Sequence, residues 1–488
     1  MRRTKTSDSF HGAAMGVFAI VAASAGEWLG GTATTGVSEY GFNYGLSGAW
    51  YTIANGIGVF FLAMLFAKLY RSLNSVTVPG IIEKFFGVKA RTVSSILLVI
   101  VMLAVGLSQM VAAGKLGENL LGLSFTPVVL VFAVLFIVYT LAGGMNAVAS
   151  TNKMHIFAMY GGVIIGVIFA LVKVGGFGEL MKWLDKDNIS AATEAAIAAT
   201  GKAGPQQQEA GGYLGMLTIG FSRVSSWVIA SLLGACTAQA GIQPVLAAKD
   251  VSTAKKACII TALVTAPFGI FTALLGMAAK AMFNKGEMLY NADNVLITGK
   301  DALPTLMTGT YLHSNTLISG VVGGLVLAAI LAAIISTVSP IILSAGTMVT
   351  KDLYQRVLKP DASDKQVLFV SRVVTAVSGV ICAVAAIALV DLSAVLDIVY
   401  AAYSLRGAIF VVVLLGIYWK KASEKGACWS MVLTGVVAVF WKVYDIVAGH
   451  YPISDGITET YAAVAVALVA TLVFSFVFPK KTPLGKAA

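Results

Sequence analysis

The chain has 488 residues, of which 58% are hydrophobic and only 12% charged, and its formal net charge is +11. Soluble domains carry about 25% charged residues, so this composition excludes an ordinary soluble protein and predicts a multi-pass protein surrounded by membrane lipid. The positive charge does not indicate a nucleic-acid partner, because the basic residues lie in short loops between apolar segments, where they determine topology.

Twelve apolar segments, each near or above the ~20 residues that a bilayer crossing needs, follow one another along the chain. They cover about residues 13–37, 45–70, 92–121, 125–143, 153–175, 213–240, 257–283, 315–348, 367–390, 394–418, 426–448 and 458–478. With the N-terminus inside, most basic residues fall on the cytoplasmic side. The sequence therefore predicts an all-α protein with about 12 transmembrane helices in a cell membrane, the bacterial or archaeal plasma membrane being the expected type.

The first and sixth segments are interrupted near their middles. Residues 25–31 contain three glycines and Glu27, and residues 234–241 begin and end with glycine. Glycine weakens a helix interior, and unwound backbone at membrane depth exposes polar groups to a ligand. Paired breaks predict one transporter domain with two inverted repeats, residues 13–175 and 213–418, followed by two accessory helices at 426–478. The alternative is that these small residues only let helices pack closely.

The eighth segment carries polar residues that could bind an alkali cation. Ala333, Ser336 and Thr337 are spaced i, i+3 and i+4, so they share one helical face. Pro340 has no N–H, which leaves the carbonyl of Ser336 without its usual helical partner. Two hydroxyls and a freed carbonyl are hard oxygen ligands. The alternative is that the hydroxyls bond to their own helix and the proline only kinks it.

Ionisable residues inside membrane spans usually mark function. Glu27 lies in the broken first span. Arg406 lies thirteen residues before Trp419, about 20 Å from the cytoplasmic interface at ~1.5 Å per residue. Arg406 could bind a substrate carboxylate, or pair with Glu27 as a gate. A permanent ion pair of Arg406 with Glu27 or Asp397 is the alternative.

Other residues are candidates for the wall of a substrate cavity. Trp28, Trp227 and Tyr403 could line it, although aromatic residues in membrane spans are often packing or interface residues. Thr237 and Gln239, in the sixth span, would suit hydroxyl groups of a solute.

Several short segments, taken in their order and spacing, resemble the sodium:solute symporter family. They are Thr77-Val78-Pro79-Gly80 with Glu83 and Gly87, Tyr139 with Gly143-Gly144 and Thr151, Gln239 and Gln243 with Ala247-Ala248-Lys249-Asp250, Ser336-Thr337 with Ser344 and Lys351-Asp352-Leu353-Tyr354, and Trp419-Lys420-Lys421 with Gly426-Ala427. The resemblance runs from the first span to about Ala427.

This resemblance implies a leucine-transporter-like five-plus-five fold, with uptake driven by a Na⁺ gradient. It places Na⁺ between the first and eighth core helices, bound by Ala333, Ser336 and Thr337 and by first-helix carbonyls near Ala22 and Ala25. Two departures from the family pattern stand out. The chain starts one helix later than family members usually do, and Asn152 follows Thr151 where the family often has aspartate.

We therefore expect a transporter rather than an enzyme: Na⁺-coupled symport of a small organic solute by alternating access. Arg406 favours a carboxylate-bearing solute such as an amino acid, organic acid or vitamin. Proton coupling through Glu27 and Asp397, a sugar carrier of the same fold, and a transporter-like sensor are the alternatives. The sequence indicates neither the solute nor the oligomeric state.

Overall fold

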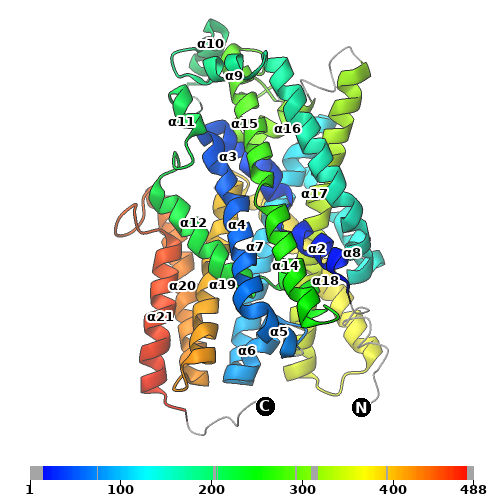
Figure 1. Ribbon diagram of the computed structural model, residues 1–488, viewed down its shortest axis with the longest axis vertical. Helices are drawn as coiled ribbons and strands as arrows, with labels where there is room; N and C mark the ends of the chain where they lie inside the picture. Colours follow the sequence, from blue (N-terminus) through cyan, green and yellow to red (C-terminus); the bar gives the residue numbers. More distant parts are fainter. Residues whose placement is uncertain are drawn as a thin grey trace.

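A computed structural model describes residues 15–73, 75–201, 205, 207–291, 294–308, 317–391 and 394–480, which are almost entirely helical (Figure 1). Its α-helices are α2 (Val17–Trp28), α3 (Val37–Tyr44), α4 (Trp50–Phe61), α5 (Ala67–Ser72), α6 (Val78–Phe86), α7 (Val88–Leu121), α8 (Phe125–Val174), α9 (Phe177–Leu184), α10 (Ala191–Thr200), α11 (Ala210–Leu214), α12 (Phe221–Gly234), α13 (Gln239–Leu246), α14 (Val251–Thr265), α15 (Phe268–Lys285), α16 (Gly299–Thr305), α17 (Leu317–Met348), α18 (Asp364–Leu389), α19 (Val395–Tyr418), α20 (Glu424–Ala448) and α21 (Glu459–Val477). Tighter 3₁₀ turns lie at Gly45–Ala49 and Ala235–Thr237, and wider π-helical turns at Thr32–Gly36, Leu62–Phe66 and Val349–Leu358.

Among the described residues, 10 helices are long and apolar enough to cross a membrane, or 11 with the bent pair α12–α13. The first predicted span does not add a further long helix because it is broken. Its inner part is α2, of 12 residues, and a π-helical turn separates α2 from α3. The α3 segment turns into the second predicted span at Gly45, where φ is +70°. Only glycine adopts this backbone without strain.

The long helix α8 contains two predicted spans, and it bends between them. Tyr139 and Thr151 form a hydrogen bond of 2.6 Å between their hydroxyls. Residues twelve apart lie about 18 Å apart along a straight helix, beyond the reach of these two side chains. The chain therefore turns between Tyr139 and Thr151, which makes Phe125–Gly143 and Ser150–Val174 separate candidate spans.

The sixth predicted span begins later than expected, at Phe221, because residues 210–214 form the separate helix α11 and Gly220 turns the chain at a φ of +90°. It is interrupted inside the predicted segment 234–241. A 3₁₀ turn ends α12, Ala238 has non-helical backbone, and α13 continues at an angle of 43°. The break therefore falls where the paired glycines predict it.

The broken helices meet in the middle of the molecule. Helix α2 packs against α8, α13, α14 and α17, while the pair α20–α21 lies on the outside against α19. In Figure 1, α9, α10 and α11 lie at the upper end and α5 and α6 at the lower end. The distribution of basic residues predicts that this lower end is cytoplasmic.

An ion-pair network closes the lower end. Arg91, at the start of α7, bonds to Asp352 with Nε–Oδ1 at 2.8 Å and to Glu83 of α6 with Nη1–Oε2 at 2.5 Å. Arg356 bonds to the other oxygen of Glu83, and Thr77 donates to Asp352 at 2.8 Å. Partial burial would raise the pKa of Glu83, but the hydrogen bonds from Arg356 and Arg91 hold it below its usual range. Two of the segments that carry the family resemblance, around Thr77 and Asp352, therefore meet here.

We expect Arg91→Ala to destabilise the protein by about 3–5 kcal/mol, because it leaves the fully buried Asp352 carboxylate without its cation. The thermal unfolding of the purified protein measures this loss. Arg91→Ala combined with Asp352→Asn should recover most of the stability, since the unpaired buried charge is gone. Equal melting temperatures for wild type and Arg91→Ala would contradict the importance of the network.

Candidate functional site

Four oxygen atoms cluster where α2 meets α17. The hydroxyl of Ser336 lies 2.8 Å from the carbonyl oxygen of Ala333 and 3.4 Å from that of Gly26. The hydroxyl of Thr337 lies 3.1 Å from the Ala333 carbonyl and also bonds to the Gly26 carbonyl. All four residues are buried. Each hydroxyl has one proton but reaches two carbonyls. If the hydroxyl protons turn away, a small cation could bind the two carbonyl oxygens and the lone pairs of both hydroxyl oxygens.

The carbonyl of Ser336, which Pro340 frees from its helix, receives a side-chain donor instead. The amide nitrogen of Asn152 lies 3.3 Å from this oxygen, and the amide oxygen of Asn152 lies 3.3 Å from Nδ1 of His155. A buried carbonyl without a partner would cost free energy, so Asn152 satisfies it. The residue that departs from the family pattern therefore lies directly beside the oxygen cluster.

Two glycines allow the first helix to approach this cluster. A Cβ added to Gly26 would collide with the amide of Asn152, and one added to Gly30 would collide with the hydroxyl of Thr337. Beyond them, the backbone N–H of Gly31 donates to Gln109 Oε1 at 2.6 Å, which satisfies a donor at the break. Glycine is needed here for close backbone approach rather than for flexibility.

The first-helix carbonyls named by the resemblance, those of Ala22 and Ala25, belong to the same helix as Gly26. Ala22 and Ala25 are both fully buried in α2, and the carbonyl of Ala25 accepts from the N–H of Leu29 at 2.9 Å. The α2 carbonyl that bonds to Ser336 and Thr337 is that of Gly26, one residue after Ala25. Of the five predicted sodium ligands, the structure brings together Ala333, Ser336 and Thr337.

Glu27 and Arg406 face each other one residue further along the first span. Glu27 Oε1 lies 3.7 Å from Arg406 Nη1, and both side chains are fully buried. Within the described part of the chain, neither carboxylate oxygen and none of the three guanidinium nitrogens has a hydrogen-bond partner. Asp397, the alternative ion partner of Arg406, instead accepts a hydrogen bond from Tyr40 at 2.7 Å. The charged pair is therefore loose and incompletely bonded.

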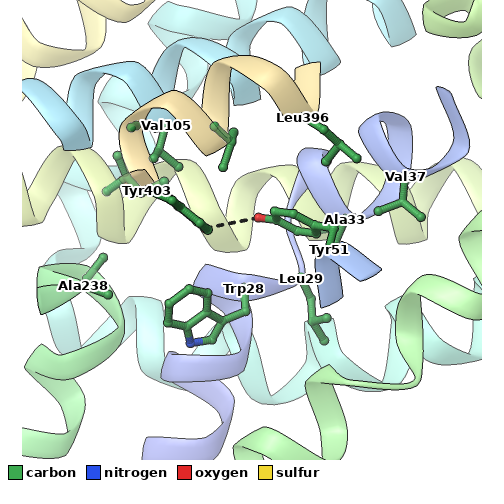
Figure 2. Packing of buried hydrophobic residues seen from close by; sticks show 14 of the residues in the cluster. Trp28, Leu29, Ala33, Val37, Tyr51, Val105, Ala238, Leu396 and Tyr403 are labelled. Carbon is green, nitrogen blue, oxygen red and sulfur yellow. Dashed lines mark hydrogen bonds between the residues drawn. The ribbon is translucent and has the colours of Figure 1, made fainter. Parts of the chain in front are cut away.

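Aromatic rings cover the charged pair. The guanidinium carbon of Arg406 lies 3.8 Å from the centre of the Tyr403 ring and 5.1 Å from that of Trp28. Figure 2 shows Tyr403 and Tyr51 pointing toward one another, with their hydroxyls 3.2 Å apart, and the ring centres of Trp28 and Tyr403 are 6.2 Å apart. Cation–π contact of this kind attracts a desolvated cation, so these rings hold the guanidinium in place.

The aromatic contacts continue along α19 away from Arg406. Trp227 stacks on Tyr400 with ring centres 4.3 Å apart, and Tyr40 packs against Trp227 at 5.2 Å. Tyr40 also bonds to Asp397 and receives a hydrogen bond from Arg223 at 3.3 Å. Trp227 thus lies two aromatic rings away from Arg406 rather than against it.

Thr237 and Gln239 lie on either side of the break in the sixth span and have different contacts. The Thr237 hydroxyl donates to the carbonyl of Arg406 at 2.7 Å, so it fixes α19 beside the break. Gln239 accepts from the N–H of Val78 at 2.7 Å and donates to the carbonyl of Val76 at 3.3 Å. Gln239 is therefore bonded to the start of α6, and the structure does not bring it to Arg406.

Tyr51 and Tyr400 also pack in this aromatic cluster, although neither was among the residues predicted to line a cavity. Tyr400 was recognisable in part, because Tyr400, Tyr403 and Arg406 follow one another at intervals of three residues, which makes them neighbours on a helix. Tyr51 lies in an otherwise ordinary apolar span and gives no such signal.

These two sites lie between the first, sixth, eighth and tenth core helices, and the comparisons with known proteins agree with a transporter. The sequence profile of the sodium:solute symporter family matches residues 10–435. The chain belongs to this family. It is 26% identical to the sodium/glucose cotransporter of Vibrio parahaemolyticus over 83% of this chain and 74% of that protein. It is 25% identical to the sodium/proline symporter of Escherichia coli, over 93% and 88% of the two chains.

Among solved structures, the chain is similar to a Na⁺-coupled sialic acid symporter in a substrate-bound outward-open state, with a TM-score of 0.72 and 18% identity. That match covers 99% of this chain and 95% of the other. The predicted leucine-transporter-like fold and family are confirmed, and the protein is a multi-pass Na⁺-coupled solute symporter. Sodium is the coupling ion.

We expect Na⁺, but not K⁺ at equal ionic strength, to raise the melting temperature of the purified protein. A ligand that binds only the folded state adds about 2.7 kcal/mol of stability at 100 times its Kd. Ser336→Ala and Thr337→Val should each reduce this shift, because each removes one hydroxyl oxygen from the cluster.

Thr347→Val is the matched control. Thr347 lies on the same helix, is equally buried, and donates to the carbonyl of Leu343 at 2.9 Å. Its removal should leave the Na⁺ shift intact. A Na⁺ shift that survives in Ser336→Ala and Thr337→Val would rule out this cluster as the cation site.

Proposed function

We propose that the protein imports a carboxylate-bearing organic solute together with Na⁺ across a cell membrane. In this proposal Na⁺ binds the oxygens of Gly26, Ala333, Ser336 and Thr337, and the solute carboxylate binds Arg406. The solute class is inferred from one observation: the guanidinium of Arg406 is fully buried and has no hydrogen-bond partner among the described residues.

The chemistry of arginine supports a carboxylate. Its guanidinium is planar, always charged, and presents N–H donors in a fork that matches both oxygens of a carboxylate. A sugar hydroxyl could bond to the same donors, but it is neutral and cannot present two charged oxygens to the guanidinium fork, as a carboxylate does. The sodium/proline symporter to which this chain is similar acts on a carboxylate-bearing solute, whereas the sodium/glucose cotransporter acts on a sugar. Arg406 favours the former class.

The positions of Gly26 and Glu27 explain how the two binding events would be coupled. The carbonyl of Gly26 belongs to the oxygen cluster, and the next residue, Glu27, belongs to the charged pair. Na⁺ would therefore fix the end of α2 and, with it, Glu27 and Trp28. A solute would then bind a pre-organised site, which lowers the entropy cost of its binding.

We expect one or more carboxylate-bearing compounds to raise the melting temperature in NaCl, in a panel of L-amino acids, monocarboxylic acids and hexoses. Arg406→Lys should weaken that binding at least tenfold, equivalent to about 1.4 kcal/mol, because lysine cannot form the bidentate contact. Na⁺-gradient-driven uptake of the same compound into proteoliposomes should fall in parallel.

The conservative control is Arg372→Lys, on an exposed position of α18, which should leave binding and uptake unchanged. If a hexose raises the melting temperature and Arg406→Lys does not change that rise, the carboxylate assignment is wrong and a sugar carrier is favoured.

A further inference from the structure

The loose pair of Glu27 and Arg406 cannot accept a carboxylate without losing its own balance of charge. Among the described residues Arg406 has one anionic partner, at 3.7 Å, and a solute carboxylate that engages its fork competes with Glu27 for the same donors. Glu27 would then be left with two buried oxygens and no cation. An unpaired buried charge is strongly unfavourable, so a solute that brings only a carboxylate is opposed by the site itself.

We propose that the solute is a zwitterion of the amino-acid type, whose carboxylate binds Arg406 while its ammonium group binds Glu27. This inference rests on the proposed function and narrows its substrate class. The solute replaces one loose ion pair with two hydrogen-bonded ion pairs, and both buried charges remain neutralised. The five polar atoms of the pair that have no hydrogen-bond partner among the described residues are then those that the two ends of the solute engage.

The backbone of the broken sixth span comes close to both charged groups. A Cβ on Gly234 would lie 3.0 Å from Nε of Arg406, and a Cβ on Gly241 would lie 2.8 Å from Oε2 of Glu27. The two glycines stand on opposite sides of the 3₁₀ turn at Ala235–Thr237. The break thus approaches an anion-binding group at one end and a cation-binding group at the other, as recognition of a molecule with two opposite charges requires.

The Na⁺ cluster does not supply the missing cation to Glu27. Its oxygens come from the carbonyls of Gly26 and Ala333 and the hydroxyls of Ser336 and Thr337, and within the described part of the chain Glu27 has no hydrogen bond to either hydroxyl. The aromatic faces of Trp28 and Tyr403, which already contact the guanidinium, offer a second favourable environment for an ammonium group.

The test uses the full-length protein in NaCl and matched pairs of probes: each L-amino acid against its des-amino carboxylic acid, for example phenylalanine against 3-phenylpropanoate. Melting-temperature titrations give apparent affinities. We expect at least one amino acid to bind the wild type at least tenfold more tightly than its des-amino counterpart. In Glu27→Gln the des-amino acid should bind more tightly than the amino acid. The amino acid loses its ion pair with Glu27, whereas the monocarboxylate no longer separates a buried anion from Arg406.

Glu39→Gln is the matched control. Glu39 is a buried carboxylate of the same span that accepts from the N–H of Val395 at 3.1 Å, a bond that an amide oxygen also accepts. The Glu39→Gln variant should bind the amino acid more tightly than its des-amino counterpart, as the wild type does. A retained Na⁺ shift in Glu27→Gln shows that this variant is folded.

Three results would overturn the zwitterion assignment: no amino acid stabilises the wild type, both members of every pair bind equally well, or Glu27→Gln weakens both members alike. Its failure is distinguishable from that of the proposed function. If monocarboxylates bind through Arg406 but amino acids show no preference, the proposed carboxylate symport is supported and the zwitterion assignment fails. If a hexose binds and its binding does not depend on Arg406, both proposals fail.

Discussion

The structure depends on one constraint: backbone that leaves the helical pattern at membrane depth must find its hydrogen-bond partners inside the protein. The first and sixth core helices are broken and the eighth contains Pro340, and neighbouring helices supply hydrogen-bond partners to their free backbone groups. Hydroxyls of α17 bond to the carbonyl of Gly26, Gln109 accepts the N–H of Gly31, and Tyr70 donates to the carbonyl of Cys236 at 2.7 Å. The contacts that make these breaks tolerable are also the contacts that bring the oxygen cluster and the charged pair side by side.

Glu27 and Arg406 stand out because none of their five side-chain polar atoms has a hydrogen-bond partner among the described residues. Single carbonyls and amides at the breaks receive partners, whereas in the described part of the chain these two charged side chains pair with each other at 3.7 Å. Such a pair adds little stability, since the desolvation of both ions opposes their attraction. A site that binds and releases a charged solute needs this property, because a pair that was already fully hydrogen-bonded would resist exchange.

Much of this arrangement could be predicted from the sequence, because it depends on local signals. The apolar spans, the glycine-rich breaks and the shared face of Ser336 and Thr337 are all read from residue spacing. The rest depends on how far each helix is rotated and how deep it lies. One residue turns a helix by about 100°, so residue spacing could not indicate that the carbonyl of Gly26 bonds to Ser336 and Thr337. It also could not indicate that Gln239 bonds to α6.

The two ends of the molecule are closed by different sets of contacts. The lower end has the ion pairs of Arg91 and backbone bonds between Met15 and the segment after α13, with Met15 N 3.0 Å from the carbonyl oxygen of Ala247. The upper end has the Tyr40–Asp397 hydrogen bond and the stacked rings of Trp227 and Tyr400. The upper end also has an ion pair, between Lys115 of α7 and Asp301 of α16 at 3.4 Å. Both ends therefore hold opposite charges in partly or fully buried positions, and separating such charges is unfavourable. Ligands shift the equilibrium between two conformational states only through their different affinities for those states. In the proposed symport, Na⁺ and solute supply this free energy by binding.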